Sequence, residues 1–192
     1  NESGDLIITS YQNVPLAEIN GFEIEYEQVF EAIMDSPNDL LVKFNYTETE
    51  SEVIVNPGDT YINSIGTVVD AQNLLANGRD TRLQGQSDTI ANLQIGLDNL
   101  QNQTQATLIV NYVSDRVRAR GIDVLPDIIE EPPLLVDFAF SKIYSYPEFE
   151  LKLSLELRNL LDEEYYASMR NIAIYDQYDL GTSASLGFKI SF

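Results

Sequence analysis

Strict alternation of apolar and polar residues at the end of the sequence limits the fold more than any other feature. Over residues 183–192, every second position from Ala184 onward is apolar, and the positions between are Ser, Gly or Lys. Successive side chains of a β-strand point to opposite faces, whereas a helix would mix the two sets. The segment is therefore predicted to be a strand with one apolar face that continues to Phe192.

Five further segments repeat this period of two, each with four or five apolar or aromatic residues on one face. Their apolar sets are Leu40, Val42, Phe44 and Tyr46; Ala91, Leu93, Ile95 and Leu97; Ala106, Leu108, Val110 and Tyr112; Leu134, Val136, Phe138 and Phe140; and Phe149, Leu151, Leu153, Leu155 and Leu157.

Two less regular strands are predicted before these six. The apolar residues of "AEINGFEIEYEQ" change phase between Ile19 and Phe22, which predicts a bulge or kink near Gly21. A short strand is predicted over residues 5–13. The chain is therefore expected to be all-β, with about eight antiparallel strands and almost no helix.

The links between the predicted strands are short at one end of the sheet and long at the other. The segments 31–39, 97–103 and 144–148 are short, whereas 48–87, 114–131 and 159–182 are long. The link through Pro15 falls at the long-link end, and the C-terminus falls at the short-link end. This is the up-and-down arrangement of outer-membrane β-barrels, whose periplasmic turns are short and whose extracellular loops are longer.

A soluble antiparallel sandwich would show the same alternation, so the period alone does not decide between the two folds. Three features favour a transmembrane β-barrel segment. The apolar faces carry no charge, the opposite faces carry charges that a water-filled lumen tolerates, and aromatic residues lie near strand ends, where an interfacial girdle would place them. These aromatic residues are Tyr46, Tyr112, Tyr144, Tyr146, Phe149 and Phe192.

Composition excludes several classes of function. The 192 residues include 31 acidic and 11 basic ones, and this net charge of -20 argues against a nucleic-acid partner and favours cations or basic partners. There is no cysteine and no histidine, which excludes thiol and histidine chemistry. No carboxylate pair or activated nucleophile is recognisable, so we expect neither an enzyme nor a cofactor. No apolar run is long enough for a membrane helix. No signal peptide opens the sequence, so we expect a piece of a longer protein.

Five stretches follow one another along the chain: "AEINGFEIEYE", "RLQGQSDTIANLQIGL", "LPDIIEEPPLLVDFAFSK", "NLLDEEYY" and "YDLGTSASLGFKISF". They resemble segments of the C-terminal part of TonB-dependent outer-membrane receptors, in that family's order. In the fourth stretch, the family pattern of Asn-Leu, Asp and Tyr is matched by Asn159, Leu160, Asp162 and Tyr165. The resemblance spans nearly the whole chain, residues 1–192.

This resemblance implies a location, partners and a function. The chain is expected to lie in the bacterial outer membrane and to form the C-terminal part of a receptor barrel of about 22 strands, without the plug domain. Its implied partners are outer-membrane lipid and lipopolysaccharide, the missing plug and remaining strands, and TonB only through the absent N-terminal part. The implied function is uptake of a scarce nutrient such as a ferric siderophore.

The resemblance also implies a role for the closing strand. In this family the barrel-assembly machinery recognises a terminal aromatic residue preceded by apolar residues at every second position. The residues that match this signal are Leu186, Phe188, Ile190 and Phe192. Two alternatives stay open: a self-contained eight-stranded outer-membrane barrel that serves as an anchor or adhesin, and a soluble β-sandwich binding module.

Charged residues provide further candidate sites. Those on the polar faces could contact a plug or line a substrate path, but the interpretation favoured is that they form a ladder of cross-strand ion pairs. These polar-face residues are Lys43, Asp98, Asp115, Asp137, Glu150, Lys152, Glu156, Arg158 and Lys189. Acidic loop residues offer oxygen ligands for calcium, but without a dedicated spacing they are interpreted as a solvated rim loosely bridged by divalent cations; they are Asp123, Asp127, Glu130, Glu131, Asp162, Glu163 and Glu164. Arg116, Arg118 and Arg120 are candidates for an anionic ligand or lipid phosphates, with snorkelling at the membrane interface favoured.

Overall fold

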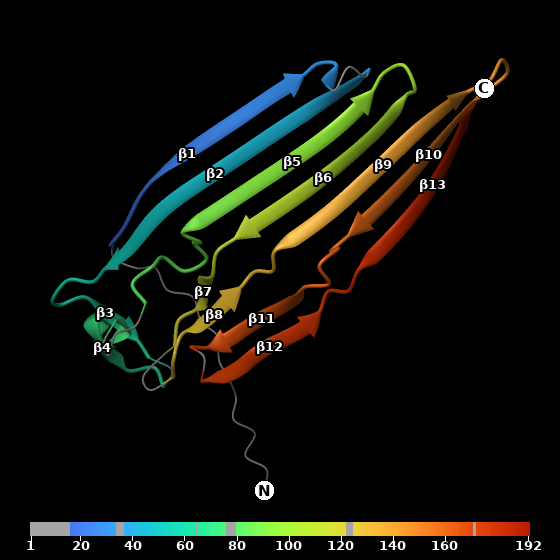
Figure 1. Ribbon diagram of the computed structural model, residues 1–192. Helices are drawn as coiled ribbons and strands as arrows, with labels where there is room; N and C mark the ends of the chain where they lie inside the picture. The colour runs from blue at the N-terminus through green and yellow to red at the C-terminus, as the bar shows by residue number, and fades with distance from the viewer. Residues whose placement is uncertain (1–15, 34–36, 64, 76–79, 122–124, 171) are drawn as a thin grey trace, which may run out of the picture.

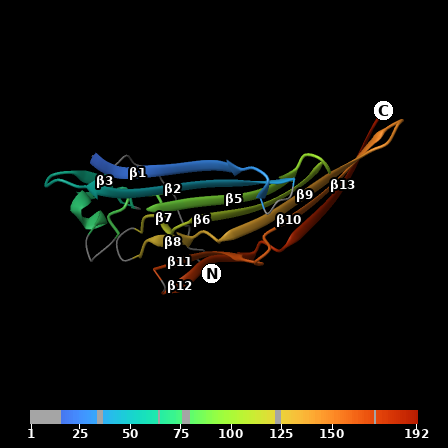
Figure 2. The ribbon, with the colours of Figure 1, turned by 45° about the horizontal axis from the view of Figure 1, so that its top comes forward.

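The computed structural model describes residues 16–33, 37–63, 65–75, 80–121, 125–170 and 172–192. Its main element is a seven-stranded antiparallel sheet that forms one curved layer (Figures 1 and 2). In spatial order the strands are β1 (Leu16–Phe30), β2 (Asn38–Ile54), β5 (Thr89–Asn99), β6 (Thr104–Val113), β9 (Leu135–Ser145), β10 (Glu150–Arg158) and β13 (Ser183–Ser191).

Each strand of this sheet is hydrogen-bonded to its neighbours in an up-and-down order. β1 and β13 are the two edges, and within the described ranges they do not pair with each other. The all-β, antiparallel prediction is therefore confirmed, while the closed ring of a self-contained small barrel is not formed by the residues described. The predicted strand over residues 5–13 lies outside those residues, so seven of the expected strands are observed.

The register places the predicted apolar sets on one face of the sheet. A single row that crosses all seven strands shows this, because residues directly opposite each other in a sheet project from the same face. The row consists of Phe30, Leu40, Leu97, Ala106, Phe140, Leu155 and Leu186. Alternate residues therefore project from the opposite face, where most of the polar and charged side chains of these strands lie.

In the described parts of the chain, no second layer covers the apolar face. Leu155 and Phe138 are half-buried, and Phe188 is 68% exposed. The fully buried apolar residues lie instead in or beside the loop end of the molecule; they are Val53, Tyr61, Ala71, Val117 and Ala167. The main sheet therefore has no sandwich core of its own in the described ranges.

The long links are not simple loops, as the sequence suggested, but contain short strands. One link holds β3 (Thr60–Ile62), β4 (Val68–Asp70) and the 3-10 helix η2 (Ala71–Leu74). The other two supply a four-stranded antiparallel sheet in the order β12 (Ala173–Asp179), β11 (Glu164–Met169), β8 (Ile128–Glu131) and β7 (Arg116–Ala119). This small sheet lies beyond the end of the main sheet, at the opposite end from the C-terminus and the short turns (Figure 1).

Of the bulge or kink predicted near Gly21, the bulge is not formed. The pairing of β1 with β2 runs without a shift from Leu16 to Phe30, so Ile19 simply lies on the face opposite to Phe22. A Cβ atom at Gly21 would press on the backbone of Glu48 and Thr49. Close approach of the two strands, rather than an extra residue, therefore explains this glycine.

Among the described elements, η2 is a 3-10 helix of four residues. No helix in the described ranges is long and apolar enough to cross a membrane.

Candidate functional site

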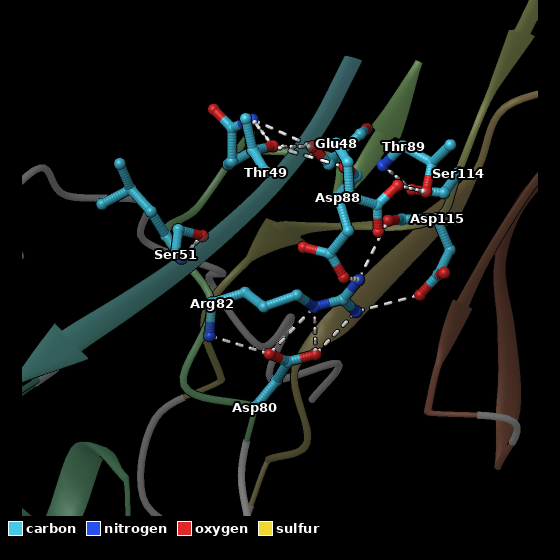
Figure 3. A network of polar contacts seen from close by, with 12 residues as sticks. Glu48, Thr49, Ser51, Asp80, Arg82, Asp88, Thr89, Ser114 and Asp115 are labelled. Atoms are coloured by element: carbon cyan, nitrogen blue, oxygen red, sulfur yellow. Dashed lines mark hydrogen bonds and ion pairs between the residues drawn. The ribbon is translucent and has the colours of Figure 1, made fainter. Parts of the chain in front are cut away.

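Arg82 is the centre of a charged network at the loop end of the main sheet (Figure 3). It precedes β5, and its guanidinium contacts three carboxylates: Asp80 at 2.7 Å, Asp115 at 2.9 Å and Asp88 at 3.2 Å. The contact with Asp80 is forked, because Nε and Nη2 of Arg82 both donate to its Oδ2 atom, at 2.9 and 2.7 Å. A planar guanidinium suits this arrangement, because its five N–H donors have a fixed geometry.

Only the centre of the network is shielded from water, because the side chains of Asp88 and Asp115 are 37% and 48% exposed. The side chain of Arg82 is 18% exposed and that of Asp80 is 17% exposed. Burial alone would raise the pKa of Asp80, but the hydrogen bonds that Arg82 donates outweigh it and lower the pKa below its ordinary value. The hydrogen bond to Asp80 raises the pKa of Arg82, against the opposing effect of burial. Both groups are therefore charged at neutral pH.

The segment that carries Arg82 is fixed to the end of β2 by hydrogen bonds. The backbone N–H of Leu83 donates to Ser51 Oγ at 3.0 Å, and the hydroxyl of Thr49 donates to the carbonyl of Ser87 at 3.0 Å. Gln86 Nε2 donates to Thr49 Oγ1 at 2.9 Å. These contacts place Arg82 beside the link between β6 and β7, where Asp115 lies.

A cavity of about 470 Å³ opens next to this network. Arg82, Arg170 and three acidic residues line it together with apolar and aromatic groups, which are Tyr112, Val113, Ile129 and Pro132. Its acidic lining residues are Asp80, Asp115 and Glu131. It is half open to solvent rather than enclosed. In the part of the chain described, no group of three or more His, Cys, Asp or Glu side chains is placed to hold a metal ion.

Asn159 of the family-like motif organises the turn between β10 and β11. It is buried and has a positive φ of 53°, a conformation that Asn adopts more readily than most residues. Its side chain donates to the carbonyls of Glu163 at 3.1 Å and Gly181 at 3.3 Å, and accepts from the Glu163 N–H at 3.0 Å. The Asn159 side chain thus connects Glu163, just before β11, with Gly181, just after β12.

The other three motif residues lie in or after the same turn. The N–H of Leu160 donates to the Val136 carbonyl at 2.8 Å, and its side chain is exposed. Asp162 also has a positive φ, of 54°, and its N–H donates to the Asn159 carbonyl at 3.0 Å. Tyr165 lies further along, in β11, and stacks on another tyrosine rather than joining the turn. The motif therefore forms a rim turn and the first strand of the loop-side hairpin.

The predicted assembly-signal residues lie together on one face of the C-terminal edge strand. Leu186, Phe188 and Ile190 are opposite Leu155, Leu153 and Leu151 of β10, and are 66%, 68% and 55% exposed. Phe192 follows the strand and is fully exposed. Among the described residues β13 pairs only with β10, so its other edge is open.

The predicted ladder of cross-strand ion pairs on the polar face is largely absent from the described part of the main sheet. Lys43 does pair with Glu27 of β1, at 2.9 Å. However, Lys152 lies directly opposite Lys189, and Asp98 lies directly opposite Asp39.

The remaining charged residues that were predicted to form this ladder contact other groups or form no ion pair. Arg158 pairs with Glu156 of its own strand at 3.1 Å, and Asp115 belongs to the Arg82 network. Asp137 accepts a hydrogen bond from the Asn159 backbone. Glu150 forms no ion pair among the described residues. The described part of the polar face therefore combines one cross-strand ion pair, Lys43 with Glu27, with two pairs of like charges directly opposite each other.

The three alternating arginines take part in ion pairs within the loop end. Arg116 contacts Glu130 at 2.8 Å, Arg118 contacts Asp176 at 3.2 Å, and Arg120 contacts the fully buried Asp127 at 3.4 Å. Arg120 also donates to the carbonyls of Asp80 and Arg82, which links it to the Arg82 network.

These pairs also change the interpretation of the acidic loop residues. Asp127 and Glu130 neutralise arginines, and the hydrogen bond from Arg116 lowers the pKa of Glu130. Glu131 lines the cavity, whereas Asp162, Glu163 and Glu164 lie at the rim turn. Asp123 lies outside the described residues. The acidic residues are thus divided among several structural contacts.

None of the family models, curated proteins or solved structures compared with this chain matches it.

The Arg82 network and the cavity were not anticipated from the sequence. The only local signal is the pair Asp80 and Arg82, two residues apart, because Asp115 is brought in by folding from 33 residues away.

Proposed function

We propose that this chain forms part of the barrel wall of a TonB-dependent outer-membrane receptor that takes up a scarce nutrient such as a ferric siderophore. One observation carries the proposal: seven antiparallel strands present a continuous apolar face that no described part of the chain covers. Soluble monomers rarely expose a contiguous apolar patch of more than a few hundred Å². A hydrocarbon environment removes this cost, and the curvature and strand order suit a barrel wall.

Two further features support the orientation of this wall. The short turns and the C-terminus lie at one end of the main sheet, and the small sheet lies at the other (Figure 1). The cavity is lined by Arg82 together with Ile129 and Glu131 of β8, so it lies at the end of the small sheet. In outer-membrane barrels the end with short turns is periplasmic and the end with longer loops is extracellular. In this proposal the cavity beside Arg82 lies on the extracellular side, where it contributes polar contacts to the arriving nutrient.

The open edges define which partners the proposal requires. β1 and β13 each need another strand, because unpaired backbone groups are costly within a membrane. The remaining barrel strands supply these, the plug fills the lumen, and TonB acts through the N-terminal part that carries the plug. The barrel-assembly machinery recognises Leu186, Phe188, Ile190 and Phe192, and lipid and lipopolysaccharide surround the apolar face.

The location is tested by membrane fractionation of cells that express the gene encoding this chain. We expect the product in the outer membrane, and we expect removal of Phe192 to reduce its assembly there. Ser191→Ala is the matched control, because Ser191 projects from the polar face of the same strand. A protein that is monodisperse without detergent would contradict the proposal and favour a soluble binding module.

The transport role is tested separately, by uptake of labelled ferric siderophores into iron-starved cells. Disruption of the gene is expected to abolish uptake of at least one of them, and loss of TonB is expected to have the same effect. An outer-membrane product whose disruption leaves the uptake of every scarce nutrient unchanged would instead favour an anchor or adhesin.

A further inference from the structure

The apolar face of the main sheet ends in a polar row near the short turns. This row lies two residues beyond the row from Phe30 to Leu186, which is about 7 Å along the strands. On β10 and β13 the face stays apolar at this level, with Leu153 and Phe188. In the proposed outer-membrane location, on which this inference rests, the polar row lies where hydrocarbon meets the lipid headgroups. The residues of the polar row are Asn38, Asn99, Thr104 and Lys142.

Lys142, in β9, is the one cationic residue on the apolar face of the seven described strands. Its side chain is half-buried, and its ammonium lies 5.1 Å from the centre of the Tyr144 ring. Among the described residues it forms no ion pair with a carboxylate. A lysine beside hydrocarbon is costly unless its ammonium reaches the headgroup layer. Lys142 therefore needs an anion at this border.

The border of the same face at the loop end is acidic instead. Beyond Tyr46, the next residues of β2 on this face are Glu48, Glu50 and Glu52, and Glu18 of β1 lies directly opposite Glu52. No lysine or arginine projects from this border in the described strands of the main sheet. An anionic headgroup is therefore repelled at the loop end of the face and attracted at the short-turn end.

We propose that Lys142 and Tyr144 bind the phosphate of an anionic phospholipid at the short-turn border of the apolar face. The Lys142 ammonium donates charge-assisted hydrogen bonds to the phosphate oxygens. The Tyr144 side chain is 38% exposed, and its hydroxyl adds a donor at the edge of an apolar ring, which suits tyrosine to a membrane interface. Leu153 and Leu151, directly opposite Lys142 and Tyr144 on β10, contact the acyl chains of the same lipid.

The test is a lipid titration of the full-length protein that contains this chain, purified in detergent and followed by native mass spectrometry. The probes are phosphatidylglycerol, whose headgroup is anionic, and phosphatidylcholine, whose choline balances the phosphate charge. We expect saturable binding of phosphatidylglycerol that is tighter than the binding of phosphatidylcholine. Lys142→Met keeps the length of the side chain but removes the charge. It is expected to weaken phosphatidylglycerol binding about fivefold, which is the contribution of one lysine near an anionic membrane surface.

Lys152→Met is the matched control, because Lys152 is directly opposite Ile143, the neighbour of Lys142, but projects from the polar face. It removes the same charge at the same level of the sheet and should leave phosphatidylglycerol binding unchanged. Lys142→Arg, which keeps the charge, should retain the binding. Lys142→Gln is a second variant in case Lys142→Met fails to fold, and far-ultraviolet circular dichroism checks the strand content of each.

The inference is overturned if Lys142→Met and Lys152→Met weaken phosphatidylglycerol binding equally, because net charge alone would then explain the effect. It is also overturned if the wild type binds phosphatidylcholine as tightly as phosphatidylglycerol. Both outcomes leave the proposed outer-membrane receptor intact. A protein that is absent from the outer-membrane fraction would instead contradict the proposed function on which this inference rests.

Discussion

The backbone N–H of Asn159 donates a hydrogen bond to Asp137 Oδ1 at 2.9 Å. This bond joins the end of β10 to the beginning of β9 on the rim where the main sheet meets the small sheet. The Asn159 side chain meanwhile holds Glu163 and Gly181, and the backbone carbonyl of Asn159 accepts from the Thr182 hydroxyl at 2.8 Å. One residue thus fixes the direction in which the hairpin β11–β12 leaves the sheet.

Replacement of Asn159 by alanine is expected to destabilise the loop end by about 1–3 kcal/mol, because buried backbone groups lose their partners. The positive φ of 53° adds strain for alanine. Asn159→Gly separates the two effects, since glycine accepts the backbone conformation but lacks the amide. Urea unfolding in detergent is the measurement. Equal stability of the wild type and Asn159→Ala would show that the turn does not depend on this side chain.

The orientation of the main sheet is tested by placing a charge on either face of β10. Leu155 lies between Phe140 and Leu186 on the apolar face. Leu155→Arg is expected to lower the free energy of unfolding in a lipid bilayer by about 2 to 4 kcal/mol, the cost of an arginine near the bilayer midplane. Ser154→Arg, on the opposite face, should cost far less. A silent Leu155→Arg together with a damaging Ser154→Leu would mean that the two faces are assigned the wrong way round.

The apolar face was predictable because its signal is local. Each strand alternates over many residues, so the side of Leu155 or Phe138 follows from its neighbours in the sequence. Register between strands is not local, but matching the apolar faces leaves few choices. The row from Phe30 to Leu186 shows the result.

The loop end was not predictable in the same way. Arg82 finds Asp88 six residues away and Asp115 33 residues away, and only the folded sheet brings these segments together. The short strands β7 and β11 have weak alternation of their own and form by pairing with β8. The predicted ion-pair ladder failed for a related reason. It required knowledge of the residue directly opposite each charge, and the residue opposite Lys152 is another lysine, Lys189.

The close approach of β1 and β2 at Gly21 predicts a glycine requirement. Gly21→Ala is expected to cost about 1–3 kcal/mol, because the new Cβ meets the Glu48 carbonyl and the Thr49 side chain. Gly96→Ala is the matched control in the same sheet, where the nearest atom is Leu41 Cβ at an ordinary 3.4 Å. Urea midpoints of the two variants should therefore differ clearly. Similar midpoints would show that β1 and β2 move apart to accommodate the new Cβ without a loss in the free energy of unfolding.

Substitution within the Arg82 network is expected to loosen the loop end. Arg82→Lys keeps the charge but loses the forked contacts, and we expect a loss of about 1–3 kcal/mol in the free energy of unfolding. Arg158→Lys is the control, since its ion pair is 69% exposed on the arginine side and should matter little. Limited proteolysis reports on the same region, with faster cleavage between β4 and β5 expected only for Arg82→Lys. Equal cleavage of the two variants would contradict a central role for Arg82.

Acidification is expected to weaken the loop end through Asp80 and Glu130. The pKa of each carboxyl is lowered in the folded chain, for Glu130 by the hydrogen bond from Arg116 and for Asp80 by hydrogen bonds from Arg82 that exceed the effect of burial. Their stabilisation is therefore complete above the ordinary carboxyl pKa of about 4 and is lost as the pH falls through the lower folded values.

The measurement is the urea midpoint between about pH 2 and pH 6, for the wild type and for Glu130→Gln, which removes one of the two titrating groups. The wild type should be the more stable protein at the upper end of this range, and the difference should shrink towards the lower end. Glu150→Gln, on the main sheet, should leave the pH dependence close to that of the wild type, because Glu150 forms no ion pair among the described residues. A constant difference between the wild type and Glu130→Gln at every pH would show that the ion pair of Glu130 with Arg116 does not contribute to the acid sensitivity.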